Sequence, residues 1–353
     1  MSNRERVRAA FRRQAEFCTA MGAPVTAAIA RSLADVLDRT TQTGRAVLDW
    51  PGDPIADALP LRLIGGLHAL HRSGVAIGFD GDADRLRATL VAHDAALRPW
   101  LDGPPQTNEP GRSAALMTGL LHLARRYGPR FELLELGSSA GLNLLIDRYR
   151  FDLDGVTVGP ESPVSIRPDW RGPPPPDAPV EIVSVRGVDV APVDLTDPAA
   201  ARLAAYVWIE ATERQARQSR AIAMVQAHGV RLDRGDAADW LEARLAEPQP
   251  AGVTRVVLHS VVWHYLGPER QTRISDLIHA AGAQATAERP FGWVMLEPNR
   301  DLAAHEVRVR GWPGEQGMEV VAHAHAHGAW VEGLATPQAA GDYVLSGVRR
   351  FRV

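Results

Sequence analysis

The sequence predicts an α/β protein in which a helical N-terminal region precedes a mostly parallel sheet with helices on both faces. Up to residue 129, apolar residues recur at spacings of three, four and seven, which is the periodicity of an amphipathic helix. From residue 130 onward, short apolar runs alternate with helical patterns, as in a parallel sheet. The first of these runs leads into a glycine-rich turn and a further helical pattern.

Three apolar stripes predict helices in the N-terminal region. They cover residues 7–25, 59–70 and 111–127, and glycine or proline follows the second and third stripes as a stop signal. We expect residues 1–129 to form a helical cap or lid and residues 130–353 to form the sheet domain.

Buried strands and helices alternate through the predicted sheet domain. Strands are expected over 131–136, 180–185, 230–232, 253–259 and 293–297, followed by antiparallel strands over 306–310 and 318–325. Helices are expected over 198–228, 236–246 and 268–281. Asp154-Gly155 joins two further short runs and predicts a β-hairpin, because this dipeptide favours a type I′ turn. The hairpin lies in an insertion at about residues 147–179.

The composition restricts the chemistry. All 39 basic residues are arginine, which excludes Schiff-base enzymes and the lysine-dependent P-loop and kinase sites. Cys18 is the single cysteine, so an internal disulfide and a Cys-rich zinc site are also excluded. The formal net charge is −3 and no apolar run is long enough to span a bilayer. We therefore expect a cytoplasmic protein without a membrane partner, and a nucleic-acid partner is disfavoured but left open.

The glycine turn, residues 135–143, reads E-L-G-S-S-A-G-L-N. Backbone N–H groups at a strand–turn–helix junction can bind a nucleotide-type cofactor. The dinucleotide pattern G-x-G-x-x-G does not fit, because Ser139 and Leu142 stand where it requires glycine. An acid, Glu135, stands two residues before the first glycine. The turn therefore resembles motif I of class I S-adenosylmethionine-dependent methyltransferases, E/D-x-G-x-G-x-G, with serine replacing the middle glycine.

Later segments resemble the other strand ends of that family, in the same order. Asp189 follows the second strand, where the family places an acid on the ribose hydroxyls, and Asp236 follows the third, near adenine. H-S-V-V-W-H-Y-L follows the fourth strand, and E-P-N ends the fifth. The resemblance implies a Rossmann-like class I methyltransferase fold with seven strands and S-adenosylmethionine as cofactor. It also implies methyl transfer to an O or N atom of a small-molecule acceptor.

The whole chain, including Q-T-N-E-P-G-R over 106–112 and I-D-R-Y-R over 146–150, is similar to an uncharacterised bacterial family, domain of unknown function 2332. This resemblance covers nearly the full length. It supports the fold rather than any particular activity.

The methyltransferase resemblance implies the site residues. Cofactor contacts are expected from Glu135, Gly137, Ser138, Ser139, Gly141, Asn143, Asp189, Asp236, Ala237 and Ser260. Acceptor or lid contacts are expected from Asn108, Glu109, Arg112, Trp263 and Tyr265. His259 is the first candidate for a general base and His264 the second, because neutral imidazole accepts a proton near pH 7. For His259, a buried structural histidine is the alternative.

Two other functions stay open. Residues 137–141 also read G-x-S-x-G, a hydrolase nucleophile elbow with Ser139 as nucleophile and Asp236 with His325 or His327 as partners. An α/β-hydrolase has several strands before its elbow, whereas here the preceding region is predicted to be helical. The other alternative is a non-catalytic cofactor- or protein-binding module with a degenerate methyltransferase fold.

Two patterns suggest metal ligands. The alternating carboxylates of 78–85 suit a hard cation, but Arg85 and Val91 replace the glycine and glutamate of an EF-hand. We expect a loop that caps a helix from about Ala83. The histidines at 323, 325 and 327 would share one face of a strand and could hold zinc. Without an identifiable carboxylate beside them, no metal site is expected.

Overall fold

The computed structural model describes residues 2–78, 82–103, 105–197, 200–299, 302, 304–314 and 316–340. The chain forms two compact units. Met1–Thr107 and Thr196–Ser219 form the first, here called the helical unit. Asn108–Leu195 and Arg220–Val353 form the second, the sheet unit. This division differs from the predicted boundary after residue 129, and no described helix is long and apolar enough to cross a membrane.

The helical unit confirms the predicted helical N-terminal region. Its elements are α1 (Asn3–Ala20), α2 (Pro24–Val36), α3 (Gln42–Leu48), α4 (Leu59–Arg72), α5 (Ala83–Ala92), α6 (Asp94–Leu97), η1 (Arg98–Leu101), α8 (Ala201–Ala205) and the start of α9 (Thr212–His228). One helix was expected over 7–25, but Gly22, with φ 72°, and Pro24 divide it into α1 and α2. No strand precedes Arg130 in the described part of the chain.

The helical unit includes a segment from much later in the sequence. Glu210 Oε1 accepts hydrogen bonds of 3.0 Å from the backbone N–H groups of Val25 and Thr26, at the start of α2. The Nδ1 atom of His68 lies 3.0 Å from the carbonyl oxygen of Ala205. Residues 196–219 therefore supply caps and core contacts to helices that precede them by more than a hundred positions.

The sheet unit is built on nine strands in the order β5-β12-β11-β10-β9-β8-β1-β6-β7. They are β1 (Arg130–Leu136), β5 (Asp169–Arg171), β6 (Glu181–Asp189), β7 (Leu232–Arg234), β8 (Thr254–Ser260), β9 (Phe291–Asn299), β10 (Ala304–Trp312), β11 (Met318–Ala324) and β12 (Trp330–Ala340). From β7 to β9 the neighbours are parallel, and from β9 to β12 they are antiparallel.

Each of the seven predicted strands has a counterpart, although β7 begins only at the last residue of the predicted 230–232, and two more strands extend the sheet. β12 and the short β5 were not predicted, so the sheet has nine strands rather than seven. β12 contains Gly333 and Pro337, which weaken its strand pattern in the sequence. Among the parallel strands, β1 stands between β6 and β8, so the chain leaves β1 toward one edge and later returns on its other side.

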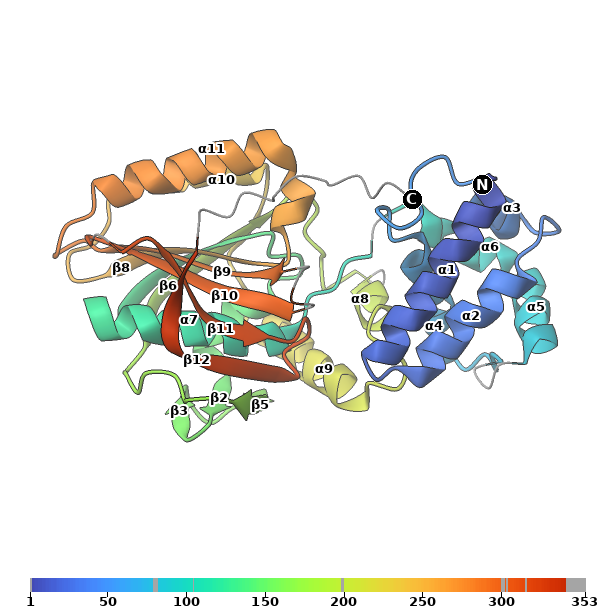
Figure 1. Cartoon of the computed structure of the whole chain (residues 1–353), viewed down its shortest axis with the longest axis horizontal. Coiled ribbons are helices and arrows are strands. Elements are labelled where there is room, and N and C mark those ends of the chain that lie inside the picture. The colour runs from blue at the N-terminus through green and yellow to red at the C-terminus, as the bar shows by residue number, and fades with distance from the viewer. Residues whose placement is uncertain are drawn as a thin grey trace. The chain divides into compact units, whose positions relative to one another are not determined.

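Helices cover both faces of the sheet. Val294 of β9 lies against Gly119 of α7 (Ser113–Tyr127), whereas the adjacent Trp293 packs in a cluster with Ile274 of α11 (Trp263–Ala283). Successive strand residues point to opposite faces, so α7 covers one face, and α11 covers the other together with α10 (Ala237–Leu245; Figure 1). The helix expected over 111–127 therefore belongs to the sheet core rather than to the N-terminal cap.

The insertion contains the predicted hairpin. β2 (Arg150–Leu153) and β3 (Val156–Val158) pair antiparallel across Asp154 and Gly155, whose φ angles are 56° and 87°. β4 (Ser165–Ile166) adds a third strand to this small sheet. The helix after the glycine turn differs from expectation: η3 (Leu142–Arg148) is a 3₁₀ helix with a kink at Leu145.

Candidate functional site

The glycine turn lies at the carboxyl end of β1 and uses left-handed backbone at three positions. Gly137, Ser139 and Gly141 have φ angles of 72°, 53° and 77°. A Cβ atom on Gly137 would lie 2.3 Å from Cγ2 of Val262, in the loop after β8. The turn is therefore in direct contact with the end of the neighbouring strand, and position 137 requires glycine for both its conformation and its space.

Asp189, at the end of β6, holds the turn from the other side. Its Oδ2 accepts a 2.8 Å hydrogen bond from Ser139 N, and its Oδ1 accepts one of 2.8 Å from Ala191 N. The next strand end is also close, because Gly235 N donates to Asp189 O at 3.1 Å. The structure thus brings together three segments that the sequence resemblance predicts to form one cofactor site.

Glu135 is buried directly beneath the turn. The pKa of its carboxyl group is raised to about 7, chiefly by burial and to a smaller extent by the charge of Asp189, while hydrogen bonds from Ser138 and Asn143 and the charge of Arg112 act in the opposite direction. Its Oε2 accepts no hydrogen bond from the described residues. Near neutral pH this carboxyl group can therefore accept a cation or donate a proton.

The segment before α7 is also tied to the turn. Asn108 Oδ1 accepts a 2.8 Å hydrogen bond from Leu142 N, and Glu109 caps the short helix η2 (Pro110–Arg112) through Gly111 N at 3.0 Å. Arg112 Nε donates to Ala326 O at 2.9 Å, in the turn after β11. Asn108, Glu109 and Arg112 are all buried. These three side chains are held by hydrogen bonds inside the sheet unit and do not form an open lid.

His259 forms a closed network at the end of β8. Trp293 Nε1 can only donate, and it lies 3.1 Å from His259 Nε2, so this ring nitrogen is the acceptor. Nδ1 then carries the proton and donates to Glu297 Oε1 at 2.7 Å. The ring is fully buried and stacks on Trp263, with centroids 4.9 Å apart. Both nitrogens are used, so the geometry supports the structural alternative and not the expected general base.

Glu297, at the end of β9, is a site component whose role the sequence did not reveal. Its Oε1 also accepts hydrogen bonds from the backbone N–H groups of Val262 and Trp263, at 3.1 and 3.2 Å. The loop that it holds contains Val261 with φ 55°, a conformation that β-branched residues rarely adopt. The sequence indicated the pairing of His259 with Glu297 in one way only: the two residues stand at the ends of consecutive predicted strands.

The other predicted contacts divide into exposed and structural residues. The rings of His264 and Tyr265 lie 3.9 Å apart, and Tyr265 is 67% exposed, whereas Trp263 is buried in the core. Asp236 caps α10 by accepting from Ala238 N at 2.9 Å, and it pairs with Arg270 at 2.5 Å. Ala237 is the first residue of α10, and Ser260 is the last of β8.

The histidine row does not form one strand face. His323 belongs to β11, but His325 and His327 lie in the following turn, where His327 N donates to His325 Nδ1 at 3.1 Å. The described residues contain no group of three or more His, Cys, Asp or Glu side chains able to hold a metal ion. In the acidic loop, Asp82 caps α5, as expected, through the backbone N–H groups of Asp84 and Arg85. Residues 79–81 of that loop lie outside the described residues.

Comparison with known proteins gives one match. Residues 8–332 match the family model described as "Uncharacterized protein conserved in bacteria (DUF2332)". No curated protein and no solved structure matches the chain. Because the matched region covers most of its length, the chain belongs to this bacterial family of uncharacterised proteins.

Proposed function

We propose that the sheet unit binds S-adenosylmethionine at the carboxyl ends of β1, β6 and β8 and transfers its methyl group to an O or N atom of a small-molecule acceptor. One observation carries the proposal. The glycine turn follows β1, and β1 is the strand at which the strand order changes direction: β6 and β7 lie on one side of it, and β8 and β9 lie on the other. Asp189, at the end of the adjacent β6, is hydrogen-bonded to this turn. In open α/β sheets, ligands bind at such a switch point, outside the carboxyl ends of the strands.

The residues at this point fit the cofactor chemically. Gly137 and Gly141 contribute no side chains to the turn. The Glu135 Oε2 atom, which accepts no hydrogen bond from the described residues, would meet the cofactor ammonium group directly or through water. Asp189 would accept from the ribose hydroxyls with its remaining lone pairs while it holds Ser139 N. The cofactor itself supplies the electrophilic methyl group of a sulfonium.

The acceptor side would lie around His264 and Tyr265. His259 is enclosed, so His264 is the remaining histidine candidate for removing a proton from the acceptor. The exposed ring of Tyr265 would give an apolar acceptor a surface on which to pack. His259 and Glu297 would act as positioning residues, because they hold the backbone of the loop that carries His264.

Calorimetric titration with S-adenosylmethionine and S-adenosylhomocysteine tests the cofactor assignment. We expect wild-type protein to bind both, and Asp189→Asn to weaken binding about tenfold, because the amide loses the charge that strengthens hydrogen bonds to hydroxyls. The matched control is Glu181→Gln, an exposed acid at the opposite end of β6, which should bind as wild type does. Failure of wild type to bind either nucleoside at millimolar concentration would remove the cofactor from the proposal.

Active-site labelling separates this proposal from the hydrolase alternative. Ser139 has a buried Oγ with no hydrogen-bond partner among the described residues, and no strand of the described chain precedes β1. We therefore expect no labelling of Ser139 by a fluorophosphonate. Stoichiometric labelling that disappears in Ser139→Ala would establish the hydrolase instead.

A further inference from the structure

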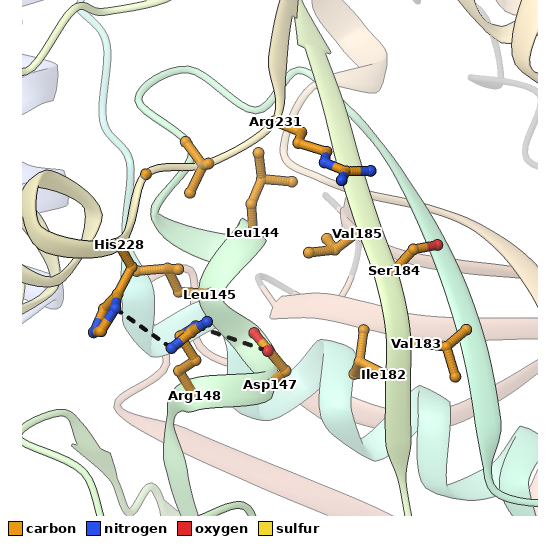
Figure 2. Close-up of a pocket in the computed structure, with 12 residues that line it drawn as sticks. Leu144, Leu145, Asp147, Arg148, Ile182, Val183, Ser184, Val185, His228 and Arg231 are labelled. Atoms are coloured by element: carbon orange, nitrogen blue, oxygen red, sulfur yellow. Dashed lines mark hydrogen bonds and ion pairs between the residues drawn. The ribbon is translucent and has the colours of Figure 1, made fainter.

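A groove of about 480 Å³ runs along β6, away from the carboxyl ends of the strands (Figure 2). β7 is short and pairs only with Gly187, Val188 and Asp189 at the end of β6. Over residues 182–186, the edge of β6 that faces away from β1 has no strand partner in the described chain. β6 is the last strand but one in the sheet, yet over these residues the backbone on this side pairs with no strand and faces the groove.

The direction of the backbone can be read from its neighbours. Gly187 N donates to Arg231 O at 2.9 Å, so the peptide groups of Gly187 point away from β1. The register between β1 and β6 is regular from Ser184 to Val188, and alternate residues of a strand point their N–H and C=O groups the same way. The N–H and C=O of Val185 therefore point out of the sheet edge, into the groove.

Apolar side chains line the groove on both sides of this strand. Ile182 and Val185 lie toward Leu144 and Leu145 of η3, whereas Val183 lies on the other side of β6 (Figure 2). Val183 is 37% exposed, which is unusual for a valine within a sheet. The groove therefore runs along the edge of β6 and is lined by side chains from both faces of the sheet.

The charges at the groove do not balance. Arg148 lies 3.9 Å from Asp147 and donates to His228 Nδ1 at 3.4 Å, so its charge is partly matched (Figure 2). The guanidinium group of Arg231 makes no ion pair and no hydrogen bond to any described residue, although it lines the same groove. One arginine is therefore left to attract an anion from outside this part of the chain.

We propose that this edge binds an extended peptide segment of a partner protein, which adds as a strand beside β6 and places an acidic side chain on Arg231. Backbone pairing with an exposed strand edge, and pockets for alternate side chains, are the two elements of such recognition. Residues 182–186 offer about 17 Å of edge, the length of a typical short strand.

Fluorescence anisotropy with labelled peptides tests the occupant. The probes are Val-Glu-Val-Glu-Val, its counterpart Val-Lys-Val-Lys-Val, and the acidic peptide with alternate amides N-methylated. We expect the acidic peptide to bind at least about tenfold more tightly than either of the others, because only it has both the charge and the backbone donors. Equal binding of the N-methylated peptide would overturn strand addition.

Reversing the charge of Arg231 should exchange the preference between the two peptides, which a misfolded variant would not do. Arg231→Glu should exchange the preference, so that the lysine peptide binds more tightly than the acidic one. Arg167→Glu changes an exposed arginine outside the groove and should keep the wild-type preference. Three further results would overturn the proposal: no saturable binding of the acidic peptide, an unchanged preference in Arg231→Glu, or full competition by free glutamate at equal concentration. A wild-type dimer that the acidic peptide dissociates would assign the edge to a second copy.

Discussion

Glu135 is 2% exposed and carries a carboxyl group whose pKa burial has raised from 4.5 to about 7. Near pH 7 the folded protein therefore holds a proton at this position for part of the time, although an ordinary glutamate is fully ionised there. Burying a carboxylate that has one unbonded oxygen lowers the stability of the fold. Such a cost is typical of groups that serve a ligand.

Glu135→Gln should therefore change how stability depends on pH. Between pH 4.5 and about 7 the folded wild type binds a proton that the unfolded chain has lost, so its stability falls as the pH rises through this window. Glutamine does not titrate. The variant should gain up to about 3 kcal/mol in free energy of unfolding, relative to wild type, between pH 4.5 and pH 8. Urea unfolding at both pH values measures this, with Glu181→Gln controlling for the lost charge, and a pH-independent difference would contradict it.

His259 shows how a partner changes the meaning of a residue. In the sequence it is a histidine at a strand end, which is a common place for an acid–base group. In the structure its two nitrogens are bonded to Glu297 and Trp293, and its ring stacks on Trp263. Through Glu297, these contacts hold the backbone of the loop after β8.

At the scale of the element, the glycine turn is set by contacts with two neighbouring strands. Gly137→Ala should destabilise the protein more than Gly155→Ala does. Both positions have positive φ, 72° and 87°, so an alanine at either position should lower the free energy of unfolding by about 1 kcal/mol through backbone strain. Only at Gly137 would the new Cβ meet a neighbour, Val262 Cγ2 at 2.3 Å, whereas nothing lies within 4 Å at Gly155.

The extra cost at Gly137 should be about 1–3 kcal/mol, as for other overpacked sites. Chemical denaturation of the two single variants measures the difference. The double variant Gly137→Ala with Val262→Ala should recover part of it, because the clashing methyl groups are removed. Equal costs at the two glycines would show that the loop after β8 moves freely away from the turn.

At the scale of the whole molecule, the chain builds its helical unit from two separate stretches. A fragment of residues 1–107 lacks Glu210, so the N–H groups of Val25 and Thr26 lose their cap. Adding a synthetic peptide of residues 196–219 should raise the helicity and melting temperature of this fragment, and loss of the cap alone is worth about 1 kcal/mol. Circular dichroism melts test this, with a Glu210→Ala peptide as the matched control. Identical melts with either peptide would contradict the role of the cap.

Local patterns were enough to predict the parts of this protein that depend on near neighbours. Apolar periodicity separated the helical region from the strands, and Asp154-Gly155 specified the hairpin, because these signals act over a few residues. The glycine turn was also visible, since left-handed backbone selects for glycine. The strand pattern did not predict β12, which carries glycine and proline, or β4 and β5, which are only two and three residues long.

Tertiary structure decided everything that depends on residues far apart in the chain. His259 and Glu297 are 38 positions apart, and Ser139 and Asp189 are 50 apart, so no local period could report that they are bonded. The same limit hid the assignment of 196–219 to the helical unit. Burial is likewise a property of the packed chain. It raised the pKa of Glu135 and enclosed His259, while Arg231 was left beside an open strand edge.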